Sequence, residues 1–219
     1  MENHLIIKEN WLTHAPKNNG FKMTAIFTLL LFGASYFYWT NLFDTNSWMT
    51  ATGQSVFTNH NYWRAWSTLF AHYDLEHLLS NSALFIPLTF LLSGYFGNIL
   101  FPLVGIFMGG IINLIVLKTM PETTTLLGIS GVVNLMGATW LTLYLLIDRR
   151  KKLRYRLAIV LFLTLLLFIP EKYQPQVSYL SHIIGYAFGI LSGLIFYGLN
   201  KKIFLADEVT ETTSDDYTD

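Results

Sequence analysis

The sequence predicts an all-α membrane protein, a bundle of six transmembrane helices, and three observations support this fold class. Hydrophobic residues make up 53% of the 219 residues and charged residues only 13%, against about 25% charged in a typical soluble domain. Uncharged runs of membrane-spanning length recur along the chain, and Lys and Arg are distributed unequally between them. A soluble domain is therefore not expected.

The uncharged runs supply the predicted spans, since a helix needs about 20 residues to cross a hydrocarbon core of about 30 Å. The longest run, 78–117, is long enough for two helices, and we expect a tight turn between them at 93–98. The shortest, 157–169, is expected to reach full depth because Tyr155 and the long Arg154 and Arg156 side chains extend it, and Pro170 ends it. The runs are 23–43, 78–117, 128–147, 157–169 and 177–199.

The orientation follows from the positive residues, which concentrate on the cytoplasmic side of membranes. With six spans, both tails and the even-numbered loops share one side, and eleven of the fourteen Lys and Arg residues fall there; Arg64, Lys118 and Lys172 fall on the other. We therefore expect a cytoplasmic N-terminal tail (1–22), a six-helix core (23–200), and an acidic cytoplasmic tail (201–219). Six acids and no Lys or Arg after residue 205 predict that this last tail is disordered.

The cluster of positive residues at 149–156 has more than one interpretation: a patch for lipid headgroups or nucleic acid, or a topology signal. We interpret it as a topology signal because it lies between two spans. The formal net charge of zero excludes a nucleic-acid binder that works through a broad basic field. The absence of cysteine excludes disulfides, Cys–zinc sites and a thiol nucleophile.

Polar residues inside predicted spans are the candidates for function, because burying them in a membrane is unfavourable. His77 and Asn81 are four residues apart and share one helix face. Ser130 lies in Gly128-Ile129-Ser130-Gly131 at the start of the fourth span. His182 lies near the start of the sixth span and is followed by a stripe of small residues, Gly185, Gly189 and Gly193, that permits close helix approach.

These features predict a Ser–His dyad. Ser130 and His182 lie at similar depth, and His182 shares a face with Gly185, so the two side chains meet if the fourth helix packs on the glycine stripe. The imidazole would accept the hydroxyl proton, and the alkoxide would attack a carbonyl carbon. His77, Asn81 and the backbone N–H of Ser130 would stabilise the oxyanion. Taken singly, each residue is more typical of ordinary packing; the hypothesis depends on their combination.

The sequence resembles the rhomboid family of intramembrane serine proteases between residues 62 and 193. The resemblance rests on four motifs: Trp63-Arg64 in the first external loop, the His-x4-His-x3-Asn spacing of His72, His77 and Asn81, Gly128-Ile129-Ser130-Gly131, and His182 with Gly185 and Gly189. The resemblance implies Ser130 as nucleophile, His182 as base, His77 and Asn81 at the oxyanion hole, and His72 as a structural neighbour. It also implies a six-helix rhomboid-like bundle of the basic bacterial form, in the cytoplasmic membrane. Two positions depart from the family pattern: Asn134 replaces a common aromatic residue, and Leu92-Ser93-Gly94 lacks a common Glu.

We therefore expect an endopeptidase that cleaves single-span membrane proteins in or near the transmembrane segment. Substrate helices and membrane lipids are the expected partners, with no nucleic acid, metal or cofactor. The alternative is a non-catalytic rhomboid-like protein that binds membrane helices as a chaperone or adaptor. A small transporter is disfavoured, because no Asp or Glu lies in the middle of a span and no internal repeat is evident. The substrate, the pathway and the oligomeric state do not follow from the sequence.

Overall fold

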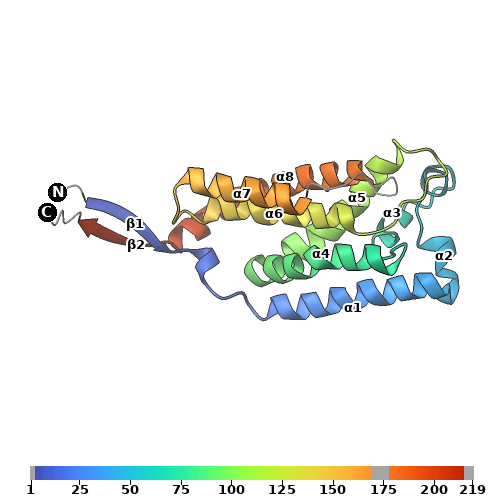
Figure 1. Ribbon diagram of the computed structural model, residues 1–219, viewed down its shortest axis with the longest axis horizontal. Helices are drawn as coiled ribbons and strands as arrows, with labels where there is room; N and C mark the ends of the chain where they lie inside the picture. Colours follow the sequence, from blue (N-terminus) through green and yellow to red (C-terminus); the bar gives the residue numbers. More distant parts are fainter. Residues whose placement is uncertain (1–2, 169–177, 215–219) are drawn as a thin grey trace.

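Long helices lie side by side along the molecule, and a small two-stranded sheet extends from one end (Figure 1). The structure is a computed structural model that describes residues 3–168 and 178–214. The long helices are α1 (Asn19–Thr40), α4 (Leu75–Phe96), α5 (Gly105–Leu117), α6 (Ser130–Ile147), α7 (Leu153–Phe168) and α8 (Tyr179–Ala206). The shorter elements are η1 (Trp11–Thr13), η2 (Leu42–Asp44), α2 (Thr45–Trp48), η3 (Gln54–Thr58), α3 (Arg64–Ser67) and η4 (Ile99–Val104).

Five helical segments in the described part of the chain are long and apolar enough to cross a membrane: α1, α4, η4 with α5, α6 and α8. This confirms the helical membrane class. The fifth predicted span, 157–169, corresponds to α7, whose 16 described residues are shorter than the roughly 20 that a span needs. That α7 crosses the membrane and completes six spans stays a prediction, and Pro170, which was expected to end it, lies outside the described residues.

The turn expected between the second and third spans is present. Helix α4 ends at Phe96, and Gly97 follows with φ of +74°, a backbone conformation that glycine adopts without strain. The chain then continues through η4 into α5. The run 78–117 therefore forms two helical segments, as its length predicts.

Helix α6 is the centre of the bundle. Most of its side chains are buried, including Val132, Leu135, Met136 and Leu143. By contrast, no residue of α7 is buried, and beyond its first turn its exposed side chains, such as Leu161, Phe162 and Leu166, are apolar. This pattern, with an apolar surface on an outer helix, is that of a helix whose outer face meets lipid rather than water.

The C-terminal tail differs from the expectation that it is disordered. Strand β1 (Asn3–Glu9) pairs antiparallel with β2 (Val209–Ser214), in the register Asn3↔Ser214 and Ile7↔Thr210. Residues 209–214 were predicted to be disordered on charge alone, and that prediction is wrong: Val209 and three threonines favour extended backbone, and β1 supplies the partner strand. Helix α8 also continues to Ala206, past the predicted end of the core.

Both tails and the turn between α6 and α7 lie at the same end of the molecule (Figure 1). Asn10 Nδ2 donates a hydrogen bond to Asp148 Oδ1 at 3.0 Å, and Arg149 pairs with Glu208 at 3.4 Å. The positive cluster and the two tails are therefore neighbours in space, as the predicted topology requires.

Candidate active site

Helix α4 presents the two predicted oxyanion residues from its first turns. Asp74 precedes the helix in extended conformation, and its carboxylate accepts a hydrogen bond from the His77 backbone N–H at 2.8 Å. This N-cap fixes where α4 begins. His77 and Asn81 therefore lie one turn apart on one face; His77 is half-buried and Asn81 is buried.

Gly128 lies directly against these two side chains. A Cβ atom at Gly128 would be 2.8 Å from His77 Cε1 and 3.6 Å from Asn81 Nδ2, and the residue has φ of +104°. Only glycine combines this conformation with this approach without strain. His77 and Asn81 therefore contact the backbone two residues before Ser130.

The segment that leads into Ser130 is held by the loop between α1 and α4. Gly128 N–H donates to the Thr68 carbonyl at 3.0 Å, and Leu126 N–H donates to the Ala51 carbonyl at 2.8 Å. The Thr68 hydroxyl also donates to the Leu126 carbonyl. These bonds fix the position at which α6 starts.

Ser130 is the first residue of α6 and is half-buried. Its backbone N–H belongs to the first turn, where a helix supplies no acceptor. Its carbonyl accepts a hydrogen bond from Asn134 Nδ2 at 2.9 Å, one turn later. Asn134, at the position where the family commonly has an aromatic residue, therefore donates a hydrogen bond to the backbone of Ser130, the candidate nucleophile.

The glycine stripe of α8 packs on α6. A Cβ at Gly185 would be 2.2 Å from the Gly131 carbonyl oxygen, and one at Gly189 would be 2.3 Å from the Leu135 carbonyl oxygen. At Gly193 the nearest atom is a side-chain atom, Thr142 Cβ at 2.8 Å. The prediction that the stripe faces the fourth span is confirmed, and the backbones touch beside Ser130.

His182 lies in the first turn of α8 and is half-buried. Its ring centroid is 6.0 Å from that of Tyr179 in an edge-to-face arrangement, and His77 is near enough for the two imidazole charges to interact. His182 Nε2 and Asn81 Nδ2 are buried without a hydrogen-bond partner among the described residues. Their hydrogen-bonding capacity is therefore available to a bound molecule.

Among the residues that the structure describes, no hydrogen bond joins Ser130 Oγ to His182. The predicted contact between them stays a prediction. Catalytic hydrogen bonds in ligand-free sites are often long and shorten only when substrate binds. The structure brings together the helix ends that carry the two residues.

His72 connects α1 to the start of α4. It is fully buried, its Nδ1 lies 3.0 Å from the Ser35 hydroxyl, and its carbonyl accepts from Trp39 Nε1 at 2.8 Å. Its ring centroid is 5.1 Å from that of His77, edge to face. Burial first, and then the neighbouring His77, lower the pKa of His72 to about 3, so the ring is neutral near pH 7.

Trp63 and Arg64 lie in the loop between α1 and α4, apart from the contacts described for His77, Asn81 and Gly128. The Arg64 guanidinium donates to the Thr50 carbonyl at 3.3 Å and lies 5.5 Å from the Trp63 ring centroid. Trp63 in turn packs near Trp48. Both residues therefore organise the loop itself.

Ser35 and Trp39 contribute to this region but were not predicted. They lie in the last two turns of α1, far from the motifs in sequence, and both contact His72. Ser35 is one of several polar residues in the run 23–43, so composition alone does not single it out. Local spacing contains no information about which helix that serine would meet.

Comparison with known proteins identifies the family. The Rhomboid domain family model matches residues 59–199, which include His72, His77, Asn81, Ser130 and His182. No curated protein matches the chain at a significant level. The match extends over more than half of the chain, from the loop before α3 to the end of α8's glycine-rich part, and the chain belongs to the rhomboid family.

Proposed function

We propose that this rhomboid is an intramembrane serine endopeptidase that cleaves single-span membrane proteins in or near their transmembrane segment. The observation that supports this most is the backbone contact between Gly131 and Gly185. Ser130 immediately precedes the first glycine, and His182 lies three residues before the second. Close approach of α6 and α8 at this point is what a Ser–His dyad needs.

Ser130 Oγ is the nucleophile and His182 the general base in this proposal. The imidazole accepts the hydroxyl proton as Oγ attacks the carbonyl carbon of the scissile peptide bond. The same proton then passes to the leaving amine, and water hydrolyses the acyl-enzyme by the reverse roles. His182 Nε2 has no protein hydrogen-bond partner in the described residues, which leaves it free for this exchange.

Three donors are available for the oxyanion: the Asn81 amide, the His77 imidazole and the Ser130 backbone N–H. Asn81 Nδ2 has no partner among the described residues and approaches Gly128 with His77. A buried donor held in place before the reaction stabilises developing charge without reorganisation. A neutral His77 donates through one ring nitrogen only.

The proposed orientation in the membrane follows from which parts of the chain lie at each end of the molecule. We propose a multi-pass protein of a bacterial cytoplasmic membrane with both termini in the cytoplasm, since both tails and the positive cluster at 149–156 lie at one end. The candidate site lies toward the opposite end, at the starts of α4, α6 and α8. Substrates would then be cut near the outer face.

The experiment is cleavage of a model single-span substrate by purified, reconstituted protein. Ser130→Ala and His182→Ala should each abolish cleavage while thermal unfolding is unchanged, because nucleophile and base act as a unit. Ser80→Ala, an exposed serine of α4, and His60→Ala, an exposed loop histidine, are matched controls expected to keep wild-type rates. Residual activity above roughly a tenth of wild type in either dyad variant would reject the assignment.

A fluorophosphonate probe distinguishes the protease from the second candidate, a non-catalytic protein that binds membrane helices. Labelling of the wild type but not of Ser130→Ala supports the protease. Capture of transmembrane segments by a wild type that neither labels nor cleaves would identify a chaperone or adaptor instead. If the wild type is an active protease, pull-down with Ser130→Ala should retain its natural substrates for identification.

A further inference from the structure

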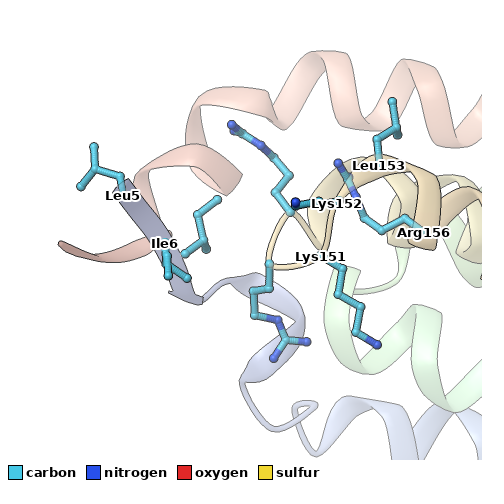
Figure 2. A pocket seen from close by; sticks show the side chains of 9 residues that line it. Leu5, Ile6, Lys151, Lys152, Leu153 and Arg156 are labelled. Atoms are coloured by element: carbon cyan, nitrogen blue, oxygen red, sulfur yellow. The ribbon is translucent and has the colours of Figure 1, made fainter. Parts of the chain in front are cut away.

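A basic cavity of about 360 Å³ lies at the end of the molecule opposite the candidate active site. It is an open surface pocket, bordered by one side of β1, the turn that joins α6 to α7, and the first turn of α7 (Figure 2). The lining combines three apolar residues of β1, one leucine of α7 and five positive residues: Leu5, Ile6, Ile7, Leu153, Arg149, Arg150, Lys151, Lys152 and Arg156.

Two of the five positive residues are already neutralised. Arg150 binds both oxygens of Asp148, with distances of 2.7 and 3.0 Å, and Arg149 pairs with Glu208 at 3.4 Å. The guanidinium of Arg150 is the main cause that lowers the pKa of Asp148, which keeps that carboxylate ionised at neutral pH. These two arginines hold the turn in place and contribute little free charge.

The remaining three positive residues have no acidic partner among the described residues: Lys151, Lys152 and Arg156. Arg156 donates to the Leu145 carbonyl, and its Nε is buried without a partner. In Figure 2, Lys152 lies between β1 and α7, and Arg156 extends back from α7. Lys151 and Lys152 are exposed and Arg156 is half-buried, so the pocket presents accessible positive charge that matches the charge of a phosphate.

The depth of the cavity indicates which anion is available. Helix α6 ends at Ile147 after 18 residues, about 27 Å at 1.5 Å per residue, so the turn at 148–152 lies where the hydrocarbon core gives way to headgroups. Leu153 beside the positive groups is 55% exposed. Phosphate groups of lipids lie at this level, with acyl chains adjacent.

We propose that this cavity binds the phosphate of an anionic phospholipid headgroup, with Lys151, Lys152 and Arg156 as its positive contacts. In the first turn of α7 the Tyr155 and Arg156 backbone N–H groups already donate to the Lys152 carbonyl, so the positive side chains supply the contacts to the phosphate. Since α7 has no buried side chain in its described length, a bound headgroup also fixes the start of this helix. The proposal does not depend on proteolysis.

The test uses the full chain in detergent micelles, titrated with dioleoyl phosphatidylglycerol or dioleoyl phosphatidylcholine, with bound lipid counted by native mass spectrometry. The first phosphatidylglycerol should bind at least roughly tenfold more tightly than phosphatidylcholine. Lys151→Gln with Lys152→Gln should weaken it roughly tenfold or more. The matched control is Lys201→Gln with Lys202→Gln, an adjacent exposed pair at the same end but outside the cavity, which should change affinity by less than about twofold.

Equal losses in both double variants, or no loss in either, would overturn the site in favour of diffuse attraction. Inorganic phosphate at matched concentration forms a third arm. If phosphate alone protects the wild type against thermal unfolding as well as the lipid does, the cavity binds free phosphate and the lipid assignment is wrong.

Hydrogen exchange supplies a readout that does not depend on affinity. Phosphatidylglycerol should slow amide exchange at 153–158 in the wild type and in the Lys201/Lys202 variant, but not in the Lys151/Lys152 variant. Lys152→Gln alone is a milder variant, to be used if the double variant unfolds. Unchanged exchange at 153–158 in the wild type with bound lipid would show that the headgroup binds elsewhere.

Discussion

His77 and Asn81 approach the Gly128 backbone from one helix face, so at the scale of single residues they are expected to act on the transition state. Asn81→Ala and His77→Ala should each lower kcat by about 10²–10³, equivalent to about 3–4 kcal/mol, with little change in KM. The physical reason is that a donor aimed at the oxyanion contributes only once negative charge develops. Steady-state cleavage of the model substrate measures both constants.

Ser80→Ala, next to Asn81 but exposed, is the control and should leave kcat unchanged. His72→Ala should act mainly on stability, because its contacts are with Ser35 and Trp39 of α1. If His72→Ala lost catalysis at an unchanged Tm while Asn81→Ala was silent, the two roles would be exchanged.

His72 also predicts a pH dependence of stability. Its pKa is about 3 in the folded protein and about 6.5 in an unfolded chain. Below pH 6.5 the unfolded state therefore binds a proton that the folded state does not, and stability falls by up to about 1.4 kcal/mol per pH unit as the pH is lowered toward 3. His77 and Asp74, the charged neighbours of the ring, remain in every variant compared.

Thermal unfolding in detergent between pH 7.5 and 4.5 measures this dependence. The slope should be shallower in His72→Gln, which keeps a side chain able to hydrogen-bond Ser35 but does not titrate. His60→Gln, an exposed loop histidine, should keep the wild-type slope. Identical slopes in the wild type and His72→Gln would contradict the assignment of this dependence to His72.

Local spacing predicted some of these contacts but not others. His77 and Asn81 share a face because they are four residues apart in one helix. A glycine at position 128 is itself a sign that another group lies close to the backbone there. The contact of Ser35 with His72 joins residues 37 positions apart, and no periodicity in either segment specifies that pairing. Asn134 was noted only as a departure, although its amide contacts the Ser130 carbonyl.

At the scale of elements, the closest approach in the molecule relevant to function is between α6 and α8. Gly185→Val and Gly189→Val should each reduce cleavage by about 100-fold or more, because a displacement of about 1 Å at a dyad has that effect. An added Cβ would lie 2.2 or 2.3 Å from backbone carbonyl oxygens of α6, and backbone cannot move aside as a side chain can. Cleavage assays at matched expression measure the loss, with Ser130 and His182 unchanged.

The same helix supplies two comparisons. Gly193→Val should be better tolerated, since its nearest neighbour is the Thr142 side chain at 2.8 Å, and Gly198→Val should be silent, because nothing lies within 4 Å. Thermal unfolding checks that all four variants fold. Full activity in Gly185→Val and Gly189→Val would mean that the close approach does not position the dyad.

The helices themselves were largely predictable because uncharged length is a strong signal in membranes. The expected spans at 128–147 and 23–43 correspond to α6 and α1, shifted by a few residues at their ends. The run at 157–169 gives a weaker signal, because α7 begins four residues earlier, among charged residues, at Leu153.

At the scale of the whole molecule, the prediction from sequence was wrong where two segments from opposite ends of the chain, β1 and β2, pair with each other. Residues 209–214 belong to the acidic tail that follows the core, which favours disorder when the tail is considered alone. Their threonines and Val209 suit a strand, and Lys8 of β1 pairs with Glu211 at 2.9 Å. The pairing of two strands about 200 residues apart cannot be predicted from the composition of either tail alone.

We expect the two tails to contribute unequally to stability. The N-terminal segment is held to the bundle by the hydrogen bond from Asn10 to Asp148, whereas the C-terminal strand β2 pairs with β1. Asp148→Ala should lower Tm by roughly 5–10 °C, because it removes three hydrogen bonds from a buried carboxylate and leaves the fully buried Asn10 amide and Arg150 unpaired, at about 2–3 kcal/mol. Deleting residues 209–219 should lower it by less than about 2 °C, because β2 pairs outside the bundle with an exposed strand.

Differential scanning fluorimetry in detergent compares the two variants, and hydrogen exchange in residues 3–9 should rise only in the deletion. Cleavage should persist in the deletion, since the Rhomboid match ends at residue 199 and the Asn10–Asp148 bond remains to hold the N-terminal segment against α6. Asp148→Asn keeps the shape of the side chain but loses its charge, and should fall between the wild type and Asp148→Ala. A deletion that unfolds as early as Asp148→Ala would show that the strand pair, rather than the buried carboxylate, holds the two ends of the chain to the bundle.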